Sequence, residues 1–317
     1  MNEELFFTQV IPALYICICA IGIVANFLVI YVLIRYSSKR SIPNIFILNL
    51  AIADFLFLCT LPLQAHRFAT KRWIFGNIAC KIVTGFDGMN QLTGIFILTC
   101  MSIDRHMAIV HPIKCRLLRT ANKARVISLA VWLASLLASQ PLWIFANDYQ
   151  VSNTTSMCII LWPTDVNGDT VFIVITFILG FILPLFVISI CYYKMFAYLR
   201  HSHRPSHSAR TYRQSRRVAL IVVVIVAVFF LCWLPFYILN FVTLISRQGR
   251  PSMAMIGAYA VSICLSYANS CLNPIIYSFM GTTFRRNMRK VFLIGFFCRS
   301  NGLNEITSAS FRRSSSR

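Results

Sequence analysis

Three carboxylates stand inside long apolar runs of this sequence, at Asp54, Asp87 and Asp104, and Arg105 directly follows the last of them. A charge at the centre of a lipid bilayer costs about 2.5–3.5 kcal/mol even on lenient scales, so each of these side chains requires a structural or functional reason. At the rise of an α-helix, Asp87 and Arg105 lie about 27 Å apart along one helix. The charged groups therefore predict separate sites at different depths of a membrane.

The first of these sites surrounds Asp87. Gln91 follows it by four positions and shares its helix face, and Asn90 lies on a neighbouring face. A buried carboxylate beside an amide can bind a cationic group. No Lys or Arg inside the apolar runs is an evident partner, which favours a cation brought by a ligand. A silent pairing with another helix is the alternative.

The second site surrounds Asp54, which lies in the middle of its apolar run. Asn26, Asn269, Ser270 and Asn273 supply polar atoms from other runs. Oxygen ligands suit a hard cation such as sodium, and ordered water would also fit. A purely structural hydrogen-bond network explains the same residues nearly as well.

The residue pattern contains no arrangement typical of an enzyme. The sequence lacks the paired aspartates of an intramembrane protease, a phosphate-binding loop and a metal-spaced histidine cluster. His201, His203 and His207 lie in a basic segment, where a solvated linker is a better interpretation than a metal site. We therefore predict no catalytic residue, no metal site and no cofactor apart from the sodium ion considered above.

Composition explains which elements must position these groups. The chain is 58% hydrophobic and 12% charged, with a mean hydropathy of +0.70. Soluble domains carry about 25% charged residues, so this chain cannot cover a surface exposed to water. The net charge of +21 would suggest nucleic acid if it lay on one soluble face. The basic residues instead gather in particular loops, which favours membrane orientation and excludes nucleic acid as a partner.

The apolar runs predict an all-α membrane protein, a seven-transmembrane helix bundle. A helix that crosses a bilayer needs roughly 20 apolar residues. Seven windows meet this length, at about 10–35, 44–67, 77–109, 124–146, 169–196, 216–245 and 253–279. The segment 283–297 is basic and apolar in alternation and too short to span, so it predicts an amphipathic helix on the membrane surface. The first run follows Met1–Glu4 without a basic region or a cleavage site and is expected to be a retained helix.

Lysine and arginine set the orientation of the bundle. They are concentrated after the first, third and fifth runs and in the tail, whereas few lie on the opposite side. The positive-inside rule therefore predicts a plasma-membrane protein with residues 1–9 as a short extracellular N-terminus. Residues 10–282 would form the seven-transmembrane domain, and 283–317 the surface helix and a basic cytoplasmic tail. Asn153, in an Asn-Thr-Thr glycosylation acceptor, falls on the predicted outer side, which agrees.

An ordered set of motifs resembles the rhodopsin-like G-protein-coupled receptors. The set covers nearly the whole chain and is specific because its members occur in order on successive runs. Its members are Asn26, Leu50-Ala51-Ile52-Ala53-Asp54, Asp104-Arg105-His106, Trp132, Pro184 with Tyr192, Cys232-Trp233-Leu234-Pro235 and Asn273-Pro274-Ile275-Ile276-Tyr277.

Finer motifs are similar to those of somatostatin receptors and their invertebrate allatostatin-C relatives. These motifs are Asp87-Gly88-Met89-Asn90-Gln91, Met101-Ser102-Ile103-Asp104-Arg105, His111-Pro112-Ile113-Lys114, Phe236-Tyr237-Ile238-Leu239-Asn240 and Ser266-Tyr267-Ala268-Asn269-Ser270-Cys271. An opioid-like or other peptide receptor is the alternative within the family. A transporter of ions or solutes is the alternative from another class, but it needs a continuous polar path, whereas these polar residues form separate clusters.

The resemblance implies a role for each group of residues. A peptide with a basic residue would bind at Asp87, Gln91, Trp233, Phe236, Tyr237, Asn240 and Tyr267. The middle network would comprise Asp54, Asn26, Asn90, Asn269, Ser270 and Asn273. The activation switch would comprise Asp104, Arg105, Tyr192, Pro235, Pro274 and Tyr277.

The resemblance also implies modifications and partners. Cys80 and Cys158 would form a disulfide, which is plausible independently because both lie on the oxidising side. Cys298 is a candidate for palmitoylation. The basic inner loops would face a heterotrimeric G protein of the inhibitory class, and the tail would meet arrestin and a receptor kinase.

Three positions depart from the family pattern. His106 replaces the usual tyrosine after Arg105. Gly94 stands where related receptors place a serine near the ion site, which argues against sodium. Ser215 occupies a position where some receptors offer a glutamate to the arginine, so we expect a weakly locked inactive state.

Overall fold

Within the residues that the structure describes, seven helical stretches are long and apolar enough to cross a membrane. The computed structural model describes residues 5–37, 41–115, 117, 119–152, 155–163, 167–201, 209–246 and 252–280. The seven stretches are Phe7–Tyr36, Ile42–Thr70, Gly76–Val110, Ala121–Ala138, Gly168–Tyr198, Ala219–Ser246 and Met253–Ile276. They confirm the predicted seven-helix bundle. The predicted surface helix at 283–297 lies outside the described residues, and so do Cys298 and Asn153.

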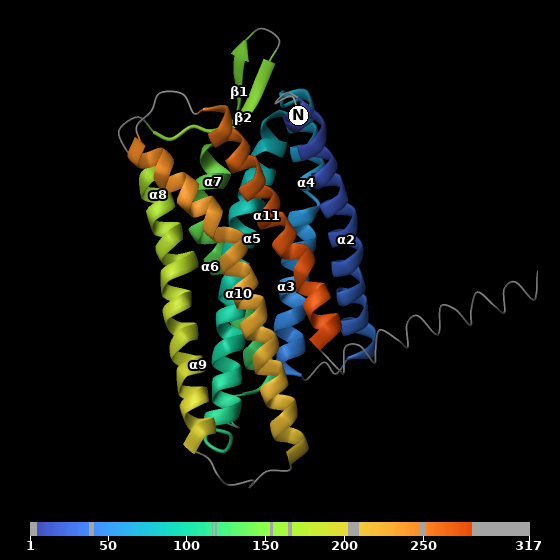
Figure 1. Cartoon of the computed structure of the whole chain (residues 1–317), viewed down its shortest axis with the longest axis vertical. Helices are drawn as coiled ribbons and strands as arrows, with labels where there is room; N and C mark the ends of the chain where they lie inside the picture. The colour runs from blue at the N-terminus through green and yellow to red at the C-terminus, as the bar shows by residue number, and fades with distance from the viewer. Residues whose placement is uncertain are drawn as a thin grey trace, which may run out of the picture.

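The bundle is built from helices that run up and down, with a small hairpin at one end (Figure 1). In chain order the elements are η1 (Phe6–Val10), α2 (Ile11–Tyr36), α3 (Ile42–Leu58), α4 (Leu61–Thr70), α5 (Gly76–Val110), α6 (Ala121–Ala138), α7 (Gln140–Phe145), β1 (Ala146–Ser152), β2 (Thr155–Ile160), α8 (Gly168–Phe177), η2 (Ile178–Ile182), α9 (Leu183–His201), α10 (Ala209–Ser246) and α11 (Met253–Met280). The end that carries β1 and β2 is called the hairpin end below, and the opposite end the Arg105 end.

The helix surfaces have the polarity expected in lipid. On α2, Ile21 and Val24 are each 59% exposed, whereas Asn26 is fully buried. The same pattern recurs on α6, where Leu129 is exposed and Ser135 is buried. Apolar side chains facing outward would be unfavourable over so large an area in water, and lipid tails remove this cost.

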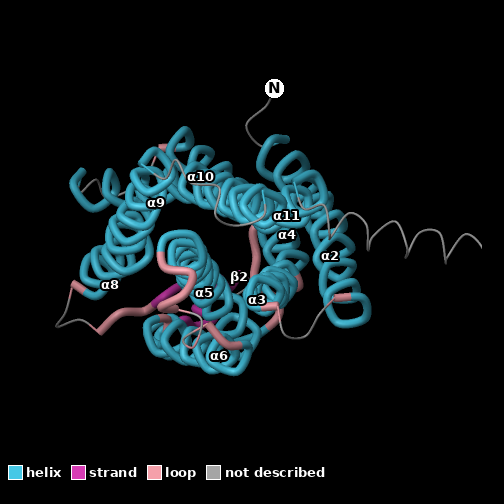
Figure 2. Tube along the Cα trace, turned by 90° about the horizontal axis from the view of Figure 1, so that it is seen from below, coloured by secondary structure: helices cyan, strands magenta, loops and turns pink. Residues whose placement is uncertain are grey.

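Helix α5 occupies the middle of the bundle (Figure 2). It packs against α3, α6, α7, α9 and α10. Because neighbours surround it, polar side chains on several faces of α5 can meet other helices rather than lipid. This position explains why α5 can carry Asp87, Asn90, Gln91, Asp104 and Arg105 within one span.

Two of the predicted spans are interrupted. The predicted helix 44–67 is divided into α3 and α4 at Cys59 and Thr60, where the Thr60 hydroxyl donates to the Phe57 carbonyl at 2.6 Å and Pro62 lies in the first turn of α4. Helix α4 then continues to Thr70, beyond the predicted end. The predicted helix 124–146 is likewise divided, at Ser139, into α6 and α7.

The prolines lie inside helices as the sequence indicates. Pro235 is within α10 and Pro274 is within α11. The five-residue π-helical turn η2 ends at Ile182, two residues before Pro184. Proline has no N–H to donate to the preceding turn, so a locally widened turn is a common way to accommodate it.

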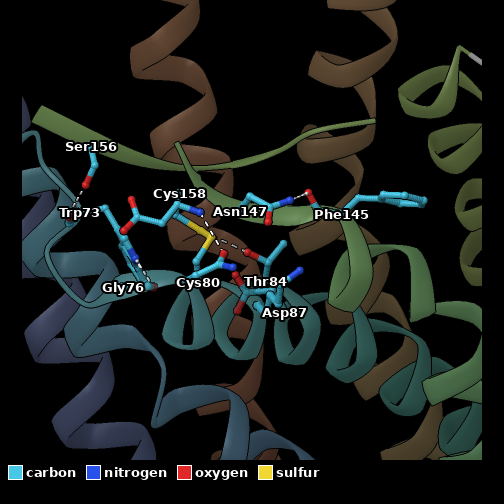
Figure 3. The surroundings of a disulfide bond; sticks show 12 residues. Trp73, Gly76, Cys80, Thr84, Asp87, Phe145, Asn147, Ser156 and Cys158 are labelled. Carbon is cyan, nitrogen blue, oxygen red and sulfur yellow. Dashed lines mark hydrogen bonds between the residues drawn. A yellow bond between two sulfur atoms is a disulfide. The ribbon is translucent and has the colours of Figure 1, made fainter. Parts of the chain in front are cut away.

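The hairpin was not predicted. β1 and β2 pair antiparallel, with Asp148 opposite Cys158. The Trp73 backbone N–H donates to the Ser156 carbonyl at 2.8 Å, and the Ser156 hydroxyl donates to the Trp73 carbonyl at 2.6 Å. These bonds attach the hairpin to the loop between α4 and α5 (Figure 3).

Candidate functional site

Asp87 lies on α5 toward the hairpin end, and neutral side chains hold its carboxylate. The Tyr267 hydroxyl on α11 donates to Oδ1 at 3.0 Å, and the Gln64 amide on α4 donates to Oδ2 at 3.3 Å. The Thr60 hydroxyl is 3.4 Å from Oδ1, but its single hydrogen has a shorter bond to the Phe57 carbonyl. Asp87 is therefore fixed between α4 and α11 and remains partly exposed.

The break between α3 and α4 is what brings these donors to Asp87. Thr60 ends the interruption and Gln64 lies one turn into α4. The partner on α11 is equally well fixed, because the Tyr267 ring is 1% exposed and stacks on Phe57 with ring centroids 4.1 Å apart. The carboxylate consequently has a defined orientation.

A basic side chain also lies near Asp87, although the sequence indicated no Lys or Arg within the membrane spans as a partner for it. Arg67 on α4 interacts electrostatically with Asp87 and with the hydroxyls of Tyr259 and Tyr267. Sequence reasoning placed Arg67 at the end of its span and counted it as a surface charge. Because α4 continues to Thr70, Arg67 is a turn inside the helix. It forms no ion pair with Asp87, since both ion pairs between described side chains involve Asp104.

Gln91 does not join Asp87, although the two share a helix face in sequence. Its amide donates to the Tyr237 hydroxyl at 2.6 Å, and that hydroxyl donates to the Thr176 carbonyl at 3.0 Å. Gln91 and Tyr237 are 7% and 1% exposed. This chain of two hydrogen bonds links α5, α10 and α8 deeper in the bundle than Asp87.

The predicted aromatic residues of α10 share one helix face. Trp233, Phe236, Tyr237 and Asn240 follow the spacing of a single face. The Trp233 and Phe236 rings are in edge contact at 6.0 Å, and Phe236 contacts Tyr259 of α11 at 5.6 Å. The Asn240 amide donates to the Phe236 carbonyl of its own helix at 2.8 Å. The structure thus brings the three aromatic residues together as one wall, with Asn240 at its end toward the hairpin.

The middle network is assembled around Asp54. Its Oδ1 accepts from the Ser270 hydroxyl at 2.7 Å and from the Asn90 amide at 3.5 Å, and its Oδ2 accepts from the Asn273 amide at 2.8 Å. Asn26 donates to the Ser270 carbonyl at 3.0 Å. Asn90 therefore belongs to this network and not to the Asp87 site.

Some oxygens of this network have no partner among the described residues. They are the amide oxygens of Asn26, Asn269 and Asn273. Buried acceptors without donors are what a bound cation or ordered water would satisfy. Gly94 has no side chain and therefore offers no oxygen to this network. A Cβ built on it would meet only carbon atoms of Leu50 and Phe229, both at 3.8 Å.

At the Arg105 end, Asp104 binds two arginines. Its carboxylate pairs with the Arg105 guanidinium, and Arg119 donates to it through Nε at 2.8 Å and Nη2 at 3.3 Å. Asp104 and Arg105 are both buried. Sequence reasoning missed Arg119, because it is one of several basic residues in its loop and no spacing rule connects it to α5.

The remaining switch residues are described only in part. The Tyr192 hydroxyl on α9 donates to the Ala219 carbonyl on α10 at 3.2 Å, which links the two helices near the Arg105 end. The side chains of Tyr277 and Ser215 lie outside the described part of the structure.

The disulfide predicted between Cys80 and Cys158 is present, with Cα atoms 5.5 Å apart. It joins the hairpin-end turn of α5 to β2 (Figure 3). Thr84 lies one turn further along α5, and its hydroxyl is 3.6 Å from the Cys158 sulfur. Asp87 follows Thr84 by one more turn. The covalent link therefore holds the hairpin over the end of α5 that carries Asp87.

Comparison with known proteins agrees with this arrangement. A profile of the family described as 7 transmembrane receptor (rhodopsin family) matches residues 25–277. The chain belongs to this family of rhodopsin-like G-protein-coupled receptors, and it is a receptor and not an enzyme.

Among the family, the chain is similar to somatostatin receptors. It is 44% identical to somatostatin receptor type 5 of Bos taurus over 284 residues, which cover 89% of this chain and 76% of that receptor. It is 42% identical to the type 2 receptor of Mus musculus, with coverage of 89% and 76%. It is also 42% identical to the type 3 receptor of Homo sapiens, with coverage of 89% and 68%.

Proposed function

We propose that this protein is a receptor for an extracellular peptide with a basic residue, and that it signals through an inhibitory-class (Gi/o) G protein. The observation that carries the proposal is the Asp87 site, a partly exposed carboxylate to which only neutral side chains are hydrogen-bonded among the described residues. An incoming ammonium or guanidinium group would complete its hydrogen bonding with a charge-assisted bond.

Orientation supports this role. The hairpin end carries the disulfide, which forms in an oxidising compartment. The positive-inside rule puts the same end outside the cell, because the basic loops lie at the opposite end. Asp87 would then face an extracellular ligand, and Arg105 would face the cytoplasm.

The proposed mechanism is a shift between two packings of the bundle. To move a population from 1:99 to 99:1, a ligand must bind one state about 5.5 kcal/mol more tightly than the other. A desolvated charge pair at Asp87 and aromatic contacts with Phe236 on α10 offer a difference of that order. Tyr192 bonds to α10 at the far end, so movement of α10 would break that bond.

Within this proposal, a somatostatin-like or allatostatin-C-like peptide is the expected class of ligand. The relatives named above are somatostatin receptors, and the motif resemblance extends to invertebrate allatostatin-C receptors. Arrestin and a receptor kinase are expected partners of the tail, as for the family, and no nucleic acid is expected.

A peptide panel tests the proposal directly. Cells that express the full chain are exposed to somatostatin-type, allatostatin-C-type and opioid-type peptides while inhibition of cAMP accumulation is measured. We expect a response to a peptide of one of the first two types that is abolished by inactivating inhibitory G proteins. A response to opioid-type peptides alone would contradict the proposed ligand class and favour the opioid-like alternative.

A second assay separates a receptor from a transporter. Purified chain should accelerate nucleotide exchange on a purified G protein in the presence of the active peptide. Flux of an ion or solute through vesicles that contain the chain, without any G protein, would contradict the proposal.

A further inference from the structure

The guanidinium group of Arg67 lies beside the Asp87 site but forms no ion pair with Asp87. Gln64 donates to Asp87 Oδ2, and Arg67 follows Gln64 by three positions on α4. Residues three apart on a helix share a face, about one turn from each other. Arg67 is therefore directed to the same side of α4 as Gln64, one turn closer to the hairpin end.

Side chains from other helices confirm this direction. Arg67 interacts electrostatically with Asp87 on α5 and with the hydroxyls of Tyr259 and Tyr267, which lie two turns apart on α11. Arg67 also interacts electrostatically with Tyr15 of α2. Arg67 thus lies near titratable side chains of three neighbouring elements and is only partly exposed.

The guanidinium of Arg67 has no hydrogen-bond acceptor among the described residues. A guanidinium has five N–H donors, yet Arg67 donates to no acceptor within the described part of the chain, and its distance from Asp87 exceeds that of an ion pair. Arg105 and Arg119 behave differently, because both bind the Asp104 carboxylate. A partly buried guanidinium without an acceptor favours an anion supplied from elsewhere.

The surroundings are suited to an anion. Lys71 and Arg72 are exposed at the end of α4, one turn beyond Arg67, and their charges raise the local positive potential. A planar carboxylate matches the fork of a guanidinium and can accept two parallel hydrogen bonds from it.

We propose that Arg67 is a second ionic subsite that binds a carboxylate of the peptide while Asp87 binds its basic group. The inference rests on the proposed function and deepens it, because it defines the ligand as dipolar. The carboxylate could come from the free carboxyl terminus of the peptide or from an acidic side chain near its basic residue. The alternative role of Arg67 is to neutralise Asp87, in which case it would weaken the binding of any cationic peptide.

The experiment varies the charge on both partners. The probes are somatostatin and an allatostatin-C-type peptide, each with a free carboxyl terminus, as the C-terminal amide, and as the amide with one glutamate beside its basic residue. The receptor variants are Arg67→Gln, Arg67→Lys and, as a matched control, Arg72→Gln, which removes an equal charge from the same rim outside the site. Potency and surface expression are measured for every pair.

We expect the wild-type receptor to prefer one carboxylate-bearing form over the plain amide by about tenfold, the worth of one charge-assisted hydrogen bond. Arg67→Gln should abolish this preference by weakening the carboxylate form alone, and Arg67→Lys should retain part of it. Arg72→Gln should change the potency of each form by less than about threefold, because Arg72 is an exposed charge that only adds to the local potential. The preferred form identifies the source of the carboxylate.

Several outcomes would overturn the inference and leave the proposed function intact. One is equal potency of all forms on the wild-type receptor, which needs no variant and so does not depend on the folding of Arg67→Gln. Another is an equal gain or loss for every form in Arg67→Gln, which would assign Arg67 the neutralising role. A receptor that responds to no peptide in any form would overturn the proposed function and this inference with it.

Discussion

Asp87 and Asp104 lie in opposite halves of the same helix, yet their surroundings are opposite in kind. Asp104 is 4% exposed and pairs with Arg105 and Arg119. Asp87 is partly exposed and accepts hydrogen bonds from the neutral side chains of Tyr267 and Gln64. The first carboxylate has all its charge compensated within the protein, and the second does not.

This difference separates a structural role from a binding role. A buried charge that loses its partner costs about 3–5 kcal/mol, so Asp104 is tied to the stability of the fold at the Arg105 end. A carboxylate held by neutral donors keeps its orientation but can still accept a cation. The sequence already separates the two aspartates by the Arg105 that follows Asp104, and the structure adds the side chains that each carboxylate meets on other helices.

The largest effect is expected from Asp104→Asn. This change leaves the buried Arg105 without its counter-ion and removes both ion pairs, at a cost of about 3–5 kcal/mol. We expect lower thermal stability of the purified receptor and higher G-protein activation without ligand. Arg119→Gln, which leaves the Arg105 pair in place, should show a smaller change of the same sign. Unchanged stability in Asp104→Asn would remove the distinction drawn between the two carboxylates.

The next largest effect is expected from Asp87→Asn. The amide keeps the shape of the side chain but loses the charge that binds the peptide, and a charge-assisted hydrogen bond is worth up to about 3 kcal/mol. Potency of the active peptide should fall by about 100-fold, whereas stability and surface expression stay near those of the wild type. Asp169→Asn removes an exposed charge at the same end and serves as the control. Equal potency of Asp87→Asn and wild type would contradict the anchor role.

Tyr267→Phe should have an intermediate effect. The stacking of this ring on Phe57 is retained, and only the hydroxyl that donates to Asp87 is lost. Without that donor the carboxylate is less well oriented, at a cost of about 1 kcal/mol, so potency should fall about fivefold. Tyr31→Phe removes a hydroxyl from the exposed face of α2, outside the binding site, and serves as the control. If both variants lose potency equally, orientation of Asp87 by Tyr267 is not the cause.

The helices could be predicted because their apolar length and their prolines are local properties of the chain. The interruption at Thr60 could not, since Pro62 fits equally well as a kink within a continuous helix. That interruption changes the site, because it turns Gln64 toward Asp87. The extension of α4 to Thr70 in turn places Arg67 inside the helix. The hairpin also escaped prediction, since β1 and β2 are short and are fixed by the disulfide and by Trp73.

Pairings between distant side chains were harder to predict than the residues that take part. Gln91 was expected beside Asp87 from its spacing, but the Tyr237 hydroxyl binds it instead. Helix spacing shows which residues share a face, whereas the neighbour that each residue meets depends on the packing of the whole bundle. The Asp104–Arg119 pair was missed for the same reason.

The smallest effect concerns the third carboxylate, Asp54, which lies between the other two in depth. Its hydrogen-bond donors among the described residues are all neutral. Gly94 follows Asn90, one of those donors, by one turn on α5, and a Cβ there meets carbons at ordinary contact distance. Gly94→Ser should therefore fit and add an oxygen ligand near the network. We expect sodium to stabilise this variant more than the wild type, because a ligand that binds the folded state raises its stability.

The measurement is thermal stability of the purified receptor in sodium chloride against choline chloride at equal ionic strength. Tightening the sodium affinity about tenfold would add at most about 1.4 kcal/mol of stability at saturation, the value of a tenfold change in affinity. Gly94→Ala introduces the same Cβ without the oxygen. If the serine and alanine variants respond equally to sodium, the cation does not use an oxygen at this position.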